Sequence, residues 1–160
     1  MLDKLDLWFT HITTPKQQLG NKPICPFAKP AITRKLYSVE PTSIQTIEAQ
    51  INTADTINLK VCIFMLQDYE QYTILELEEK TQQLNNKYLQ EDKVILDNDP
   101  RNPFTISGVT TTFPDCYLWI VQDLADLTEK SELLKAGDYY TYWTQKQIDE
   151  VVTWRNLTET

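Results

Sequence analysis

The chain has 160 residues, of which 41% are hydrophobic and 24% are charged, and this composition predicts one compact globular domain. With 15 Lys and Arg against 23 Asp and Glu, the formal net charge is -8. An acidic chain of this kind does not favour binding to nucleic acid or to an anionic membrane surface. The three glycines exclude a glycine-rich phosphate loop, because such loops need several closely spaced residues with positive φ.

Neither a membrane-spanning segment nor a secretory signal is expected from the sequence. The longest apolar run, 61–66, is too short to cross a bilayer, and acidic residues stand where a signal peptide would need a basic start and an apolar stretch. The three cysteines, Cys25, Cys62 and Cys116, form no CxxC pair, and His11 is the only histidine. We therefore expect a cytoplasmic protein without a metal site, and the sequence identifies no cofactor.

Prolines divide the chain into regular and irregular parts. Five of them lie between Pro15 and Pro41 and three between Pro100 and Pro114, which marks two irregular segments because proline cannot donate a backbone hydrogen bond. Within a single domain over 1–160 we expect four parts: an N-terminal helix and Pro-rich loop over 1–34, a βαβαβ core over 35–97, a long loop over 98–115, and a strand with C-terminal helices over 116–160.

In the first half of the chain, apolar residues at helical spacing predict an amphipathic helix over 2–12. After the Pro-rich loop, 35–40 reads as a strand, and a Thr42-x-x-Gln45 capping box predicts a helix from Ile44 onward. The β-branched and apolar segment 57–66 is typical of a central strand covered on both faces.

In the second half, Asp68-x-x-Gln71 is expected to cap a long helix that reaches Tyr88, with Thr81 filling one place in its apolar stripe. Two more strands are predicted over 93–97 and 116–122, followed by a helix over 126–136 and another after Thr144. The order β-α-β-α-β-β-α-α favours an α/β fold with a mostly parallel four-stranded sheet, or one with an antiparallel edge strand, covered by helices. It is also compatible with a thioredoxin-like core order.

The first candidate site is Cys25, which lies in a Pro-flanked segment with Lys29 and Arg34 nearby. A thiol beside cations has a lowered pKa and becomes a nucleophilic thiolate, so a reactive cysteine is one interpretation. The other is that Cys25 is an inert apolar plug that anchors the loop to the core. A dithiol mechanism is excluded, because Ala28 stands where a resolving cysteine would be.

The segment Cys25-Pro26-Phe27-Ala28, together with Trp8 in the N-terminal helix, resembles an uncharacterised bacterial family with a Cys-Pro-Phe-Ala motif. The resemblance covers about the first thirty residues. Because no activity is assigned to that family, the resemblance implies a shared architecture and no particular reaction.

The second candidate site is the acid-rich end of the third core strand, with Asp97, Asp99 and Arg101. Ligands of open α/β sheets bind beyond the carboxyl ends of strands, so these side chains could orient a polar substrate. Asp, Asn and Pro are also ordinary turn residues, which is the alternative interpretation.

The third candidate is the aromatic run 139–143, which includes Tyr140 and Trp143. Aromatic residues with polar groups are enriched at protein interfaces, so a protein partner is one hypothesis, and a loop that holds the last helices against the sheet is the other. The sequence therefore predicts a non-catalytic binding or interaction module. The alternative is a small-molecule enzyme or monothiol redox protein that uses Cys25.

Overall fold

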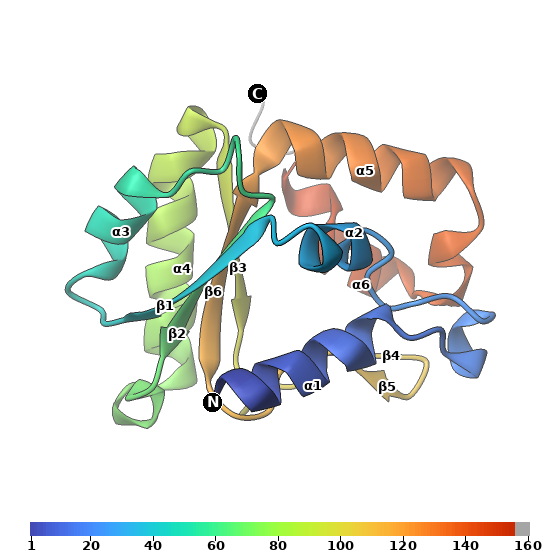
Figure 1. The fold of residues 1–160 in the computed structure, drawn as a ribbon, viewed down its shortest axis with the longest axis horizontal. Helices are drawn as coiled ribbons and strands as arrows, with labels where there is room; N and C mark the ends of the chain where they lie inside the picture. The colour runs from blue at the N-terminus through green and yellow to red at the C-terminus, as the bar shows by residue number, and fades with distance from the viewer. Residues whose placement is uncertain (156–160) are drawn as a thin grey trace.

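The computed structural model describes residues 1–155 and contains one four-stranded sheet (Figure 1). Along the sheet the strands follow the order β1 (Tyr37–Thr42), β2 (Val61–Leu66), β6 (Tyr117–Asp123) and β3 (Lys93–Asn98). β1 is parallel to β2, whereas β6 is antiparallel to both of its neighbours. The last strand of the chain therefore lies inside the sheet, and β3 lies at an edge.

This arrangement corrects the expectation of a mostly parallel sheet with, at most, an antiparallel edge. Two of the three strand pairings are antiparallel, and the antiparallel strand is internal. The physical reason is the connection between β3 and β6, which contains no crossover helix and returns to the same end of the sheet, where Asn98 faces Leu118. The sheet is thus mixed, and its order does not confirm the thioredoxin-like core.

Helices cover both faces of the sheet, so that the domain has three layers (Figure 1). The helices α3 (Ile47–Thr53) and α4 (Ile74–Tyr88) lie on one face, and α1 (Leu2–Thr13) and α2 (Ala28–Thr33) lie on the other. The chain continues with α5 (Leu124–Ala136), a 3-10 turn over Tyr139–Tyr142 and α6 (Gln145–Val151). No helix within residues 1–155 is long and apolar enough to cross a membrane.

Two hydrophobic clusters fill the spaces between these layers. Phe64 and Trp119 belong to the cluster under α3 and α4, and Met65 and Leu118 belong to the cluster under α1. All residues of β2 from Cys62 to Leu66 are buried, which confirms that this apolar segment is covered on both faces. A smaller third cluster lies beside Trp143.

Several segments differ locally from the expectation. The helix α3 begins at Ile47 with Thr46 as its N-cap, so the predicted Thr42-x-x-Gln45 capping box does not form. The short helix α2 lies within the predicted Pro-rich loop, and β2 begins at Val61 instead of residue 57.

The helix α4 is capped by Thr73 and not by Asp68: the N–H of Thr73 donates to Glu76 Oε2 at 2.6 Å, and the N–H of Glu76 donates to Thr73 Oγ1 at 3.1 Å. The predicted loop over 98–115 contains a hairpin of β4 (Thr105–Ile106) and β5 (Val109–Thr110). Its turn residues Ser107 and Gly108 both have positive φ, as a tight hairpin requires.

The side chain of Asn85 covers part of the free edge of β3. Its Nδ2 donates to the carbonyl of Ile95 at 2.8 Å, and its Oδ1 accepts from the N–H of Ile95 at 2.9 Å. Both residues are buried. The carboxamide therefore takes the place of a neighbouring strand at this position and holds α4 against the edge of the sheet.

We predict that Asn85→Ala lowers the free energy of unfolding by about 2–4 kcal/mol, because it leaves two buried backbone groups of Ile95 without a partner. Urea unfolding measures this change. The matched control is Gln83→Ala on the exposed face of α4, which should stay within about 0.5 kcal/mol of the wild type. An equal loss in both variants would contradict the role assigned to Asn85.

Candidate functional site

A cleft with a volume of about 700 Å³ opens beside the free edge of β3. We call it the β3 cleft. Its walls come from β3, from the exposed side of α4, from the β4–β5 hairpin and from the C-terminal segment, and they include Glu78, Gln82, Leu96, Asp97, Asp99, Phe104, Ile106, Trp143, Glu150 and Trp154. The cleft thus joins segments that are far apart in the sequence.

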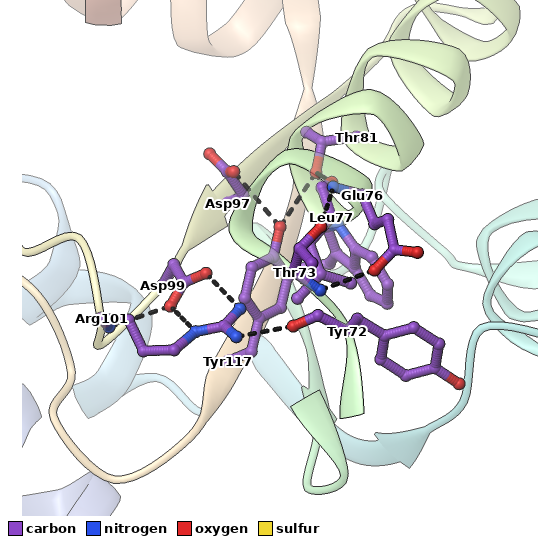
Figure 2. A network of polar contacts seen from close by, with 10 residues as sticks. Tyr72, Thr73, Glu76, Leu77, Thr81, Asp97, Asp99, Arg101 and Tyr117 are labelled. Atoms are coloured by element: carbon purple, nitrogen blue, oxygen red, sulfur yellow. Dashed lines mark hydrogen bonds and ion pairs between the residues drawn. The ribbon is translucent and has the colours of Figure 1, made fainter. Parts of the chain in front are cut away.

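Asp97 is the carboxylate that β3 carries into the cleft. The hydroxyl of Tyr117 donates to its Oδ2 at 3.2 Å, and its other carboxylate oxygen points away from this network (Figure 2). The side chain of Asp97 is exposed to water in the open cleft. Desolvation by the protein atoms nearby raises the pKa of Asp97, the hydrogen bond from Tyr117 opposes the change, and the charge of Glu78 adds to it.

A buried polar network connects Asp97 to the core (Figure 2). The indole N–H of Trp119 donates to Thr81 Oγ1 at 2.9 Å, and Thr81 Oγ1 in turn lies 2.9 Å from the carbonyl of Leu77 and 3.0 Å from the hydroxyl of Tyr117. Burial, followed by the charge of Asp97, raises the pKa of Tyr117, so its hydroxyl stays protonated.

Three hydrogens satisfy this network when Asp97 is ionised. Trp119 donates to Thr81, the Thr81 hydroxyl can donate to Tyr117, and Tyr117 donates to Asp97. The carboxylate of Asp97 is therefore the acceptor at the end of a chain of hydrogen bonds that begins in the core.

Asp99 and Arg101 form an ion pair at the rim of the cleft (Figure 2). Arg101 Nε and Nη2 donate to the two carboxylate oxygens of Asp99 at 3.0 and 2.8 Å, and Nη1 donates to the carbonyl of Tyr72 at 2.7 Å. The backbone N–H of Arg101 also donates to Asp99 Oδ1. This geometry ties the turn after β3 to the segment before α4, and Arg101 does not line the cleft.

The aromatic run over 139–143 packs mainly on itself. The ring of Trp143 lies 5.8 Å from Tyr139, 5.1 Å from Tyr140 and 6.1 Å from Phe104, measured between ring centroids. Trp143 also lines the cleft, whereas Tyr140 does not. The acid-rich strand end and the aromatic run, which the sequence presented as separate candidates, therefore meet at one site through Asp97, Asp99 and Trp143.

Cys25, Lys29 and Arg34 do not line the cleft. Cys25 packs against the cluster under α1, and its backbone N–H donates to the carbonyl of Ile12 at 3.0 Å. The residue is partly exposed, but its thiol is enclosed, and burial raises its pKa despite the opposing hydrogen bonds from the Phe27 and Ala28 backbone. Lys29 lines a separate depression of about 220 Å³ between α1 and α2.

Several residues of the cleft carried no signal in the sequence. Glu78 and Gln82 lie four residues apart on the exposed face of α4, where charged and amide side chains are the rule. Glu150 and Trp154 belong to the C-terminal region, whose position against β3 depends on the whole fold. Among residues 1–155, no group of three His, Cys, Asp or Glu side chains is placed to hold a metal ion.

We predict that Asp97→Asn leaves the fold intact and raises the free energy of unfolding at pH 7 by up to about 1 kcal/mol, because it removes an ionisation that folding disfavours. The folded pKa of Asp97 is raised above its ordinary value of 3.8, so ionisation favours the unfolded chain. The gain in stability of Asp97→Asn over the wild type should therefore vanish below pH 3.8, the ordinary pKa, and grow as the pH rises through the folded pKa of Asp97.

Urea unfolding between pH 3.5 and pH 7 measures this trend. Asp55→Asn is the control, and its stability relative to the wild type should change with pH in the opposite direction. The reason is that hydrogen bonds from the backbone N–H and the side chain of Asn58 lower the pKa of Asp55. Its stability should fall relative to the wild type as the pH rises. A loss of stability at pH 7 in Asp97→Asn would show that ionisation of Asp97 does not disfavour the folded state.

Comparisons of the chain with protein-family models, with curated proteins and with solved structures find no match. The chemistry of the β3 cleft is therefore the basis for assigning a function.

Proposed function

We propose that this protein is a non-catalytic binding module that holds a small molecule in the β3 cleft. The observation that carries the proposal is the convergence of Asp97, Phe104, Trp143 and Trp154 on one concave site. The volume of about 700 Å³ falls within the range of roughly 300–1,000 Å³ that is usual for small-molecule sites. Apolar walls with a few polar groups, one of them with a perturbed pKa, are the usual composition of such sites.

A binding role is favoured over a catalytic one by the state of the polar side chains in the cleft. Asn85 is engaged with the backbone of Ile95, and Asn98 exchanges two hydrogen bonds with the backbone of Phe113 at 3.1 and 2.8 Å. Thr81 already makes three polar contacts. Among the described lining residues there is no thiol and no imidazole, so the cleft does not contain a Cys–His or Ser–His type of pair.

The alternative, a monothiol enzyme or redox protein that uses Cys25, has less support. A reactive cysteine needs a lowered pKa, whereas burial raises the pKa of this thiol. The backbone hydrogen bonds of Cys25 with Ile12 and Ala28 instead suit a role in fixing the loop between α1 and α2. That role agrees with the architectural meaning of the Cys-Pro-Phe-Ala resemblance, which stays a prediction.

Two further proposals concern the cellular location of the protein and a protein partner. The free thiols of Cys25, Cys62 and Cys116 suit a reducing compartment, which supports a cytoplasmic location. A protein partner at the aromatic C-terminal region also stays a prediction, and it would meet chiefly Tyr142, which is 41% exposed, because the neighbouring rings pack within the domain.

We predict that fragments which bind the protein compete for one site and lose at least tenfold in affinity in Gln82→Phe, since the larger side chain fills part of the cleft. Ligand-observed NMR with a library of cationic, neutral and anionic fragments measures this. Gln83→Phe is the matched control, because Gln83 is the exposed neighbour on α4 and does not line the cleft. Absence of hits, or hits insensitive to Gln82→Phe, would overturn the proposal.

For Cys25 we predict slow alkylation. At pH 7.5 iodoacetamide should modify Cys25 more slowly than it modifies free glutathione, because the raised pKa reduces the fraction of thiolate. Peptide mapping by mass spectrometry separates Cys25 from the buried Cys62 and Cys116. A rate above that of glutathione would favour the enzyme hypothesis.

A further inference from the structure

We propose that the ligand of the β3 cleft is an organic cation, in which an ammonium group is attached to an apolar body and pairs with Asp97. This inference rests on the proposed small-molecule site and specifies its chemistry. All charged side chains that line the cleft are acidic. They are Glu78, Asp97, Asp99 and Glu150, and none of the lining residues in the described chain is Lys, Arg or His. An anionic ligand would meet only repulsion there.

The four carboxylates are not equally available to a ligand. Asp99 is already neutralised by the two hydrogen bonds from Arg101. Glu150 lies 3.7 Å from Lys146 in an exposed pair, which water screens. Asp97 has no ion-pair partner among residues 1–155, and its only side-chain hydrogen bond comes from the neutral hydroxyl of Tyr117. Glu78 and Asp97 are therefore the two lining carboxylates without a counter-ion among residues 1–155. Both side chains are exposed, and Asp97 is the one that a hydrogen bond from Tyr117 holds in place.

A cation that pairs with Asp97 would gain more than an ordinary surface ion pair. The side chain of Asp97 is exposed, but it lines the cleft, so a ligand bound there would exclude part of the water around the carboxylate and strengthen the interaction. Phe104, Trp143 and Trp154 offer aromatic faces in the same cleft. Such faces bind the apolar body of a ligand and also attract cations.

The edge of the sheet argues for a small molecule and against a peptide that adds as a fifth strand. An added strand needs the outward N–H and C=O groups of β3 in sequence. At Ile95 both groups are already bonded to the buried side chain of Asn85. Strand addition would require Asn85 to be displaced, whereas a small cation reaches Asp97 without this change.

The test uses three probes with the same apolar body and different charge: 4-phenylbutylammonium, 4-phenylbutanol and 4-phenylbutyrate. Isothermal titration calorimetry of the full chain at pH 7.5 gives their affinities. We expect the ammonium compound to bind at least tenfold more tightly than the alcohol, and the carboxylate to bind more weakly than the alcohol. Raising KCl from 20 to 300 mM should weaken binding of the ammonium compound and leave that of the alcohol nearly unchanged.

Variants then locate the cation. Asp97→Asn should reduce affinity for 4-phenylbutylammonium at least tenfold and leave affinity for 4-phenylbutanol unchanged. Asp55 is an exposed carboxylate outside the cleft, so Asp55→Asn should change the affinity for neither compound. Glu78→Gln on α4 is the second variant, for which a smaller loss than for Asp97→Asn is expected, because no hydrogen bond within residues 1–155 fixes the Glu78 carboxylate as Tyr117 fixes that of Asp97.

Three results would overturn the inference: equal or tighter binding of the alcohol, tighter binding of 4-phenylbutyrate, or ammonium binding that Asp97→Asn does not weaken. None of these results decides the proposed function, which the fragment library with Gln82→Phe and Gln83→Phe tests separately. If none of the three probes binds, the cation proposal also fails, and the fragment library then decides separately whether the cleft binds any small molecule.

Discussion

β3 has a hydrogen-bonded neighbour on one side only, because β6 enters the sheet between β2 and β3. An edge strand presents unpaired backbone groups at every second residue, and these groups need partners or water. At Ile95 the partner is Asn85, which also fixes α4 beside the edge. At Asp97, two residues further along, the β3 cleft lies between this edge, α4 and the C-terminal segment. The position of the cleft thus follows from the sheet order.

The helix α4 links this edge to the core through two polar residues on one face. Thr81 and Asn85 lie four residues apart and are both buried, although most residues of that face are apolar. Asn85 bonds to β3, and Thr81 bonds to Tyr117 and Trp119 of β6. Buried polar groups of this kind fix the register between helix and sheet, because any shift would leave several of them without partners.

Hydrophobic pattern and turn chemistry predicted most elements of the fold, and the positions of β2, α4, β3 and β6 agree with those expectations within a few residues. The sequence order could not predict the sheet order, since that depends on the return of the chain between β3 and β6. Thr81 was expected to fill a place in an apolar stripe, and only its surroundings reveal that it accepts a hydrogen bond from Trp119. Asp97 and Trp143 were predicted as binding residues, but nothing local in the sequence indicated that they share a cleft.

Asp97 connects the stability of the domain to the chemistry of the cleft. Its carboxylate accepts a hydrogen bond from Tyr117 and has no counter-ion among residues 1–155, so the fold holds a charge that it does not neutralise. The raised pKa of Asp97 means that folding disfavours the ionised form. Natural proteins keep such unfavourable groups chiefly where a ligand or a reaction uses them. A bound cation would provide the counter-ion that the fold omits, and the free energy of binding would then add to the stability of the folded state.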